Sequence, residues 1–147
     1  MKNVFFLALI FSISIFAGCR TTTSAGSGGA NGGNENAGAS SEIRQISVEQ
    51  AKRAVEETGA QFIDVRTPEE YRGGHAPKAV NFPLDNLEEN LVKLDKQKPV
   101  YVICQTGRRS QKAAEILQKA GFGELYNVAG GTSAWESAGL PIEKSER

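Results

Sequence analysis

The chain has 147 residues, which is enough for one domain of ordinary size and too few for two. Its 17 lysine and arginine residues equal its 17 aspartate and glutamate residues, so there is no net charge at pH 7. This balance argues against a nucleic-acid-binding protein, which normally shows a basic excess.

The first eighteen residues have the features of an export signal. A short basic start is followed by an apolar run over residues 4–17, shorter than the roughly 20 residues of a membrane-spanning helix. The stretch FAGC, which ends at Cys19, resembles the lipobox of bacterial lipoproteins, with phenylalanine where leucine is usual. This resemblance implies a signal peptide over 1–18 and a lipid on Cys19. The alternative is an ordinary signal that is cleaved close to this cysteine.

Residues 19–41 are expected to form the lipidated cysteine and a flexible tether. The segment 21–41 is almost all Gly, Ser, Ala, Asn and Thr, which cannot bury enough apolar surface to fold. The anchor would hold the protein in the cell envelope, on the periplasmic or outer-surface side of a membrane. If Cys19 carries the lipid, Cys104 has no partner for an internal disulfide, because the chain has only two cysteines.

From residue 42 to 147 short strands alternate with helices. Capping boxes at Ser47 and Thr67 each predict a helix start, and glycines near positions 59 and 73 predict the ends. This alternation predicts one α/β domain with an open, mostly parallel sheet and helices on both faces. The expected strands are 61–65, 79–82, 100–103 and 125–128, and the expected helices are 47–58, 67–72, 84–94, 110–120 and 132–138.

Cys104 directly follows the most strand-like segment, VYVI at 100–103, and precedes a helix. In open α/β sheets the ligand crevice lies beyond the carboxyl ends of the strands. Gly107 allows a tight turn whose backbone amides can converge on an anion, and Arg108 and Arg109 add positive potential. These features favour a thiolate, so we expect a lowered pKa for Cys104. The alternative is an inert buried cysteine.

Three stretches together are similar to those of single-domain rhodaneses, which are thiosulfate sulfurtransferases. They are IDVRTPEEYRGGHAPKAVNFPL, CQTGRRS and VAGGTSAWESAGLPIEK, in the family's order. The loop departs from the family at Gln105, where arginine is common, so the substrate preference stays open.

The resemblance implies that Cys104 takes a sulfur atom from thiosulfate or a similar donor as a persulfide. A thiol or cyanide then accepts this sulfur, and no metal or cofactor takes part. Backbone and side-chain groups of the loop bind the substrate, and a charged network supports it. The expected binding residues are Gln105, Thr106, Gly107, Arg108 and Arg109, and the supporting residues are Asp64, Arg66 and Glu70. Arg109 either contacts the substrate or braces the loop. We take a monomer as the default.

Two other functions use the same residues. A catalytically silent rhodanese module could bind partners or sense sulfide. A phosphatase or arsenate reductase is the weaker alternative, because its loop has one residue more than the four that separate Cys104 from Arg109. His75, the only histidine, is expected to be a turn residue and not a general base, and Trp135 to pack in the core or at the pocket rim.

Overall fold

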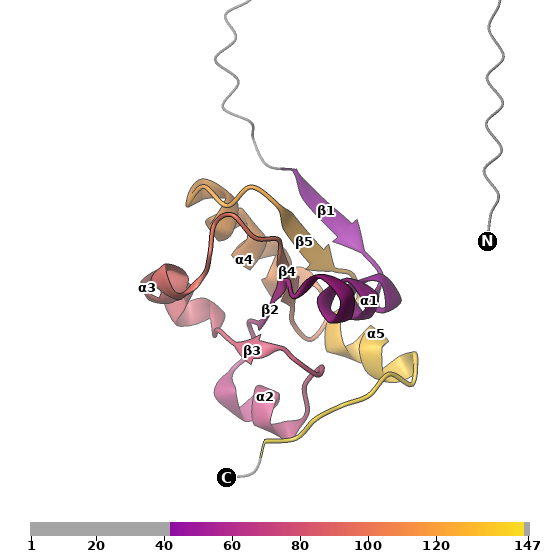
Figure 1. Ribbon diagram of the computed structural model, residues 1–147. Coiled ribbons are helices and arrows are strands. Elements are labelled where there is room, and N and C mark those ends of the chain that lie inside the picture. Colours follow the sequence, from indigo (N-terminus) through magenta and orange to yellow (C-terminus); the bar gives the residue numbers. More distant parts are fainter. Residues whose placement is uncertain (1–41, 146–147) are drawn as a thin grey trace, which may run out of the picture. The chain divides into compact units, whose positions relative to one another are not determined.

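The computed structural model describes residues 42–145. Five parallel strands form one sheet in the order β1-β5-β4-β2-β3, with β4 at its centre (Figure 1). This confirms the expected open parallel sheet with helices on both faces. The strands are β1 (Ile43–Ile46), β2 (Gln61–Asp64), β3 (Val80–Asn81), β4 (Val100–Ile103) and β5 (Leu125–Val128). The helices are α1 (Val48–Thr58), α2 (Pro68–Gly73), α3 (Leu87–Asn90), α4 (Arg108–Lys119) and α5 (Gly131–Ser137).

The signal peptide, Cys19 and the tether lie outside the described residues, so their assignment remains a prediction. Within the described part of the chain no helix combines the length and hydropathy needed to span a bilayer. The same part contains no cluster of three or more potential metal ligands.

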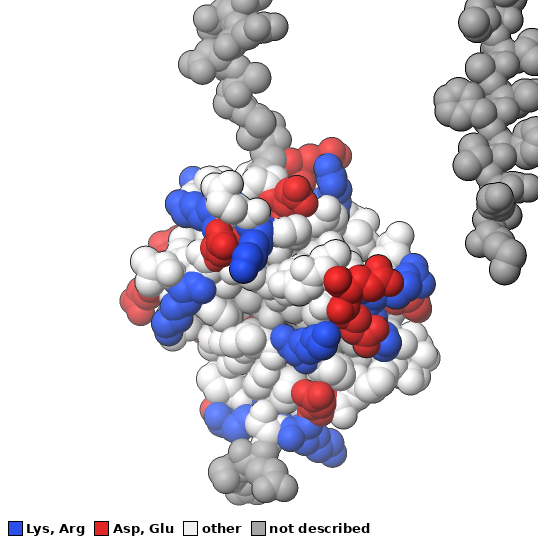
Figure 2. Space-filling model, in the orientation of Figure 1, with Lys and Arg blue, Asp and Glu red and all other residues white. Residues whose placement is uncertain are grey.

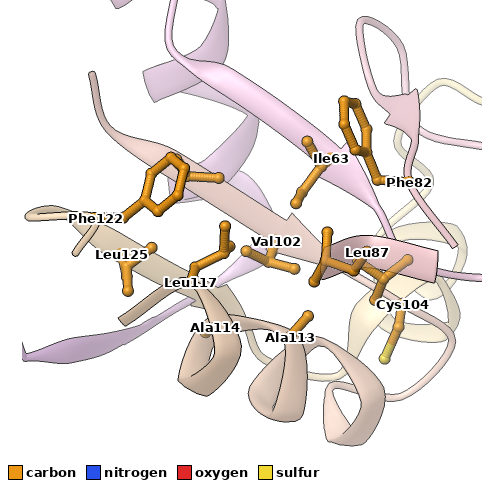
Figure 3. Packing of buried hydrophobic residues seen from close by; sticks show 12 residues of the cluster. Ile63, Phe82, Leu87, Val102, Cys104, Ala113, Ala114, Leu117, Phe122 and Leu125 are labelled. Carbon is orange, nitrogen blue, oxygen red and sulfur yellow. The ribbon is translucent and has the colours of Figure 1, made fainter. Parts of the chain in front are cut away.

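Two apolar clusters cover the two faces of the sheet. Alternate residues of the central strand divide between them, with Val100 and Val102 on one face and Tyr101 and Ile103 on the other. Helices α3 and α4 cover the first face, where Cys104 lies at the end of the packed row (Figure 3). Helices α1 and α5 cover the second, where Trp135 packs against Phe62 with ring centroids 5.9 Å apart. Strand β4 is buried on both faces, and Cys104, the residue after it, is buried as well.

Both expected capping boxes are present. The Ser47 side chain accepts from the backbone of Gln50, and the Thr67 side chain accepts from the backbone of Glu70. In each case the later side chain accepts in return from the cap residue's backbone. The two helix starts, α1 and α2, are therefore specified locally.

Three expectations need correction. Strand β1, Ile43–Ile46, was not among the expected strands. The single helix expected over 84–94 is a short α3 between two 3₁₀ turns, Leu84–Asn86 and Leu91–Lys93. The Asn90 side chain donates to the Asn86 carbonyl at 2.8 Å, and such local side-chain bonds compete with a continuous helix. Helix α4 begins at Arg108, one or two residues before the start expected near Arg109 or Ser110.

Candidate active site

Cys104 lies at the carboxyl end of the central strand β4, where its side chain is 1% exposed. The chain then turns through a short loop into α4. Gly107, the residue before the helix, has φ 91°, a conformation that L side chains rarely adopt. A Cβ at this position would also lie 3.3 Å from the Gly130 nitrogen. The tight turn expected here therefore requires glycine at position 107, both because of its backbone angle and because Gly130 packs close to it.

The sulfur atom of Cys104 accepts two hydrogen bonds. The Gly107 amide donates to Sγ at 3.2 Å, and the Ser110 hydroxyl donates at 3.4 Å. Burial acts to raise the pKa of the thiol. The Ser110 hydroxyl and the backbone amides of Ser110, Thr106 and Gly107 act in the opposite direction and prevail. The pKa of Cys104 is therefore lowered, and the thiolate is the favoured state at a lower pH than for free cysteine.

Ser110 belongs to this site, although the sequence argument did not select it. It is fully buried in the first turn of α4, and its hydroxyl reaches the sulfur because the helix starts at Arg108. The available signal was its place in the CQTGRRS stretch, six residues after Cys104. Its role depends on the helix start, which is poorly predicted from sequence.

The start of α5 holds the other side of the loop. The Thr132 amide donates to the Cys104 carbonyl at 2.8 Å, and the Ser133 amide donates to the Gln105 carbonyl at 3.1 Å. The Gln105 side chain donates to the Ser133 hydroxyl at 3.0 Å. Gly131 has φ 58°, and a Cβ there would overlap the Cys104 carbonyl. The loop that follows the cysteine is thus held by backbone hydrogen bonds and by the Gln105 side chain.

Arg109 and Glu70 form a two-pronged ion pair. Nη1 and Nη2 of Arg109 each donate to one carboxylate oxygen of Glu70 at 2.7 Å. The Arg109 guanidinium lowers the pKa of Glu70 to about 2. Glu70 also accepts from the Thr67 amide at 2.9 Å as part of the capping box. This pair is what the bracing role predicts for Arg109. Arg109 also lines the hollow beside the loop, so its contact with a substrate stays a prediction.

Asp64 and Arg66 form a separate buried pair at the end of β2. The Arg66 guanidinium donates to both Asp64 oxygens, at 2.7 Å for Nη2 to Oδ2. Nη2 also donates to the Gly74 carbonyl at 2.7 Å. The supporting residues expected as one network are therefore two pairs, one joining β2 to the turn after α2 and one joining α2 to α4.

Arg108 and Thr106 lie on the exposed side of the loop. They line a hollow of about 430 Å³ together with Gln105, Arg109 and Lys112. Within the described residues neither Arg108 nor Lys112 has an ion-pair partner. Since Arg109 is paired with Glu70, Arg108 and Lys112 supply the uncompensated positive charge beside the loop. Elsewhere, on the face seen in Figure 2, charges of both signs are interspersed.

His75 and Trp135 have structural contacts. His75 is buried, stacks on Tyr71 with ring centroids 3.7 Å apart, and exchanges two backbone hydrogen bonds with Glu143. Trp135 is buried and donates to the Pro141 carbonyl at 2.8 Å. Both residues therefore fasten the C-terminal segment to the domain.

Comparison with known proteins agrees with this architecture. The family model "Rhodanese-like domain" matches residues 47–138. The chain is 36% identical over 100 residues to "Thiosulfate sulfurtransferase GlpE" of Vibrio cholerae serotype O1, covering 68% of this chain and 94% of that protein. It is 46% identical over 76 residues to "Uncharacterized protein YqhL" of Bacillus subtilis, covering 52% of this chain and only 60% of YqhL.

A solved rhodanese-like domain protein from Staphylococcus aureus superimposes with a TM-score of 0.63 at 33% identity, covering 71% of this chain and all of that one. The fold and the cysteine loop define a domain of the rhodanese class. The chain belongs to the rhodanese-like domain family, and relatives in that family are named as sulfurtransferases.

Proposed function

We propose that this protein is a sulfurtransferase that carries a sulfane sulfur on Cys104. The observation that supports this most directly is the sulfur atom itself, which accepts hydrogen bonds from the Gly107 amide and the Ser110 hydroxyl. These donors stabilise negative charge on Sγ without a separate general base. The proposal agrees with the name of the GlpE relative.

In the first step the Cys104 thiolate attacks the outer sulfur of thiosulfate or a similar donor. The sulfur–sulfur bond of thiosulfate breaks, its electron pair leaves with sulfite, and Cys104 becomes a persulfide. The amides of the loop 105–109 stabilise the added sulfur and the departing oxyanion. Arg108 attracts the donor anion, while Arg109 keeps the loop in place through Glu70.

In the second step a thiolate or cyanide attacks the outer sulfur of the persulfide. The electron pair of the broken bond returns to Sγ, which restores the Cys104 thiolate. Cyanide leaves as thiocyanate and a thiol leaves as its own persulfide. No external oxidant or reductant is consumed in either step.

Formation of thiocyanate from thiosulfate and cyanide tests the proposal. We expect turnover by the wild-type chain and none by Cys104→Ser. A second candidate is a silent module that binds partners, which the 1% exposure of Cys104 favours. A silent module would form no thiocyanate. Absence of thiocyanate with the wild-type chain would therefore refute the proposed sulfurtransferase activity.

We also propose that Cys19 carries a lipid that anchors the domain at the cell envelope. The support is the FAGC stretch after a short apolar run. Metabolic labelling with a fatty-acid analogue should mark the full-length chain and not Cys19→Ala. Labelling of the variant, or its absence from the parent chain, would contradict the anchor.

A further inference from the structure

Gly107 is the residue through which the cysteine loop joins α4. Its amide donates to the Cys104 sulfur at 3.2 Å, and its carbonyl accepts from the Gln111 amide at 3.2 Å as the first hydrogen bond of the helix. Glycine permits the observed φ of 91° but also permits many other angles. Because Gly107 has no side chain of its own, other groups must hold it in the conformation that directs its amide at the sulfur.

The side chain of Asn127, on β5, is such a group. Its Nδ2 donates to the Gly107 carbonyl at 3.2 Å. Strand β5 lies directly beside β4 in the sheet, so this bond ties the cysteine loop to the neighbouring strand. Gly107 therefore contacts the sulfur through its amide and the sheet through its carbonyl.

Asn127 occupies a position where an apolar side chain would fit the surroundings. Side chains two residues apart on a strand lie on the same face, and Leu125 on this face belongs to the apolar cluster under α4. Asn127 is 4% exposed, and within the described residues its Oδ1 is the one buried side-chain nitrogen or oxygen without a hydrogen-bond partner. A buried acceptor without a donor is unfavourable. The favourable polar contacts of this side chain are therefore those of Nδ2.

Three acceptors surround Nδ2, so this position requires a hydrogen-bond donor. Besides the Gly107 carbonyl, they are Oε1 of Gln45 at 2.9 Å and Oε1 of Gln111 at 3.3 Å. The two glutamines are joined to each other, because Nε2 of Gln45 donates to Oε1 of Gln111 at 2.7 Å. A rotated Asn127 amide would turn Oδ1 toward these three oxygens, which would repel it. The orientation of the amide is therefore set, with a donor facing the loop.

We infer that Asn127 is a positioning residue of the cysteine loop, which holds the Gly107 carbonyl so that the Gly107 amide stays directed at the Cys104 sulfur. The inference rests on the proposed sulfurtransferase function, since it assigns Asn127 a part in preparing the thiolate that attacks the donor. Without this bond the glycine samples other backbone angles, its amide spends less time at Sγ, and the thiolate loses part of its stabilisation.

The pH profile of Cys104 alkylation in the full chain tests this role, with labelling read by peptide mass so that Cys19 is not counted. Asn127→Leu keeps a side chain of similar size without a donor, and Asn127→Ser places its hydroxyl one bond short of the Nδ2 position. Both variants should move the profile to higher pH. Both should also slow alkylation and sulfur uptake from thiosulfate at neutral pH by about three- to tenfold, at most the loss of one hydrogen bond to a charged group. The alkylation rate at high pH, where the thiol is fully ionised, should match that of the wild-type chain.

Two controls separate positioning from a general loss of stability. Gln45→Ala removes another contact of the same amide and leaves the bond to Gly107 in place. Val55→Ala opens a cavity in the apolar cluster on the other face of the sheet, so it should lower the urea midpoint. Neither control should move the alkylation profile. Arg109, whose charge interacts with Cys104, is unchanged in every variant.

An unshifted profile in either Asn127 variant that folds would overturn the positioning role, and so would an equal shift in a control. A faster rate at high pH would also overturn it, because it would show that the substitution exposes Cys104 and does not withdraw a donor. Failure of the wild-type chain to gain a sulfur atom from thiosulfate would refute the proposed function instead. The two failures are distinguishable, because alkylation reports the ionisation of Cys104 whether or not the chain transfers sulfur.

Discussion

Both terminal nitrogens of Arg109 donate to the carboxylate of Glu70, and this pair joins the start of α4 to the start of α2. Each side chain is about one-third exposed, at 35% and 34%. The pair therefore connects the helix that follows Cys104 to a helix nearly forty residues earlier in the chain, and water screens it only in part.

Breaking this pair should give a pH-dependent loss of stability. The Glu70 carboxyl has a pKa near 2 in the folded chain, below its ordinary value of 4.5. Its contribution is present above pH 4.5 and fades as the pH falls toward 2. Arg109→Gln should lower the free energy of unfolding by about 1 kcal/mol at pH 7 and by less at pH 3. The value at pH 7 is small because solvent screens this partly exposed pair.

Urea unfolding at both pH values measures this difference. Lys52→Gln is the control, because it breaks the exposed Lys52–Glu56 pair within one helix. That change should cost about 0.5 kcal/mol or less. An equal loss for Arg109→Gln at pH 7 and pH 3 would show that the ion pair is not what the mutation removes.

Removing the Ser110 hydroxyl should raise the pKa of Cys104. The hydroxyl donates to the sulfur and is one of the groups that hold this pKa below its ordinary value. Ser110→Ala should therefore shift the pH profile of Cys104 alkylation to higher pH. It should also slow sulfur uptake at neutral pH by about tenfold, which corresponds to the loss of one hydrogen bond to a charged group. Ser137→Ala, which removes a hydroxyl that donates to a carbonyl within α5, should leave the profile unchanged. An unshifted Ser110→Ala profile would exclude the hydroxyl as a stabilising donor.

A side chain at Gly131 should disturb the loop. Gly131 and Gly59 have similar angles, φ 58° and φ 62°, so alanine is strained at both by roughly 1–2 kcal/mol. At Gly59 the added Cβ meets open space, whereas at Gly131 it overlaps the Cys104 carbonyl. Gly131→Ala should therefore lower the free energy of unfolding by about 1–3 kcal/mol more than Gly59→Ala does, which is the usual range for overpacking. Equal losses for the two variants in urea titrations would show that the close approach of Gly131 to the Cys104 carbonyl does not contribute to stability.

The sequence predicted the parts of the fold that are determined by neighbouring residues. The two capping boxes are local patterns and are present as expected. The run at 100–103 forms a strand buried on both faces, which places Cys104 at the end of the central strand. The leucines at 84, 87, 91 and 94 do pack on the core, but the asparagines between them interrupt the helix that their spacing predicted.

The parts that escaped prediction depend on contacts distant in sequence. Strand β1 has little pattern of its own and is specified by pairing with β5, with Ile43 opposite Leu125. Asn127 is an ordinary polar residue in the sequence, and its contacts to Gln45 and Gly107 exist only after folding. The division of the charged residues into two pairs likewise follows from where α2 and α4 meet.

Intact mass of the chain after incubation with thiosulfate tests the central claim most directly. The account predicts a gain of about 32 Da, one sulfur atom, from the persulfide step. The gain should be absent in Cys104→Ser and should disappear after a thiol is added. An unchanged mass in the wild-type chain, or the same gain in Cys104→Ser, would contradict sulfur transfer through Cys104.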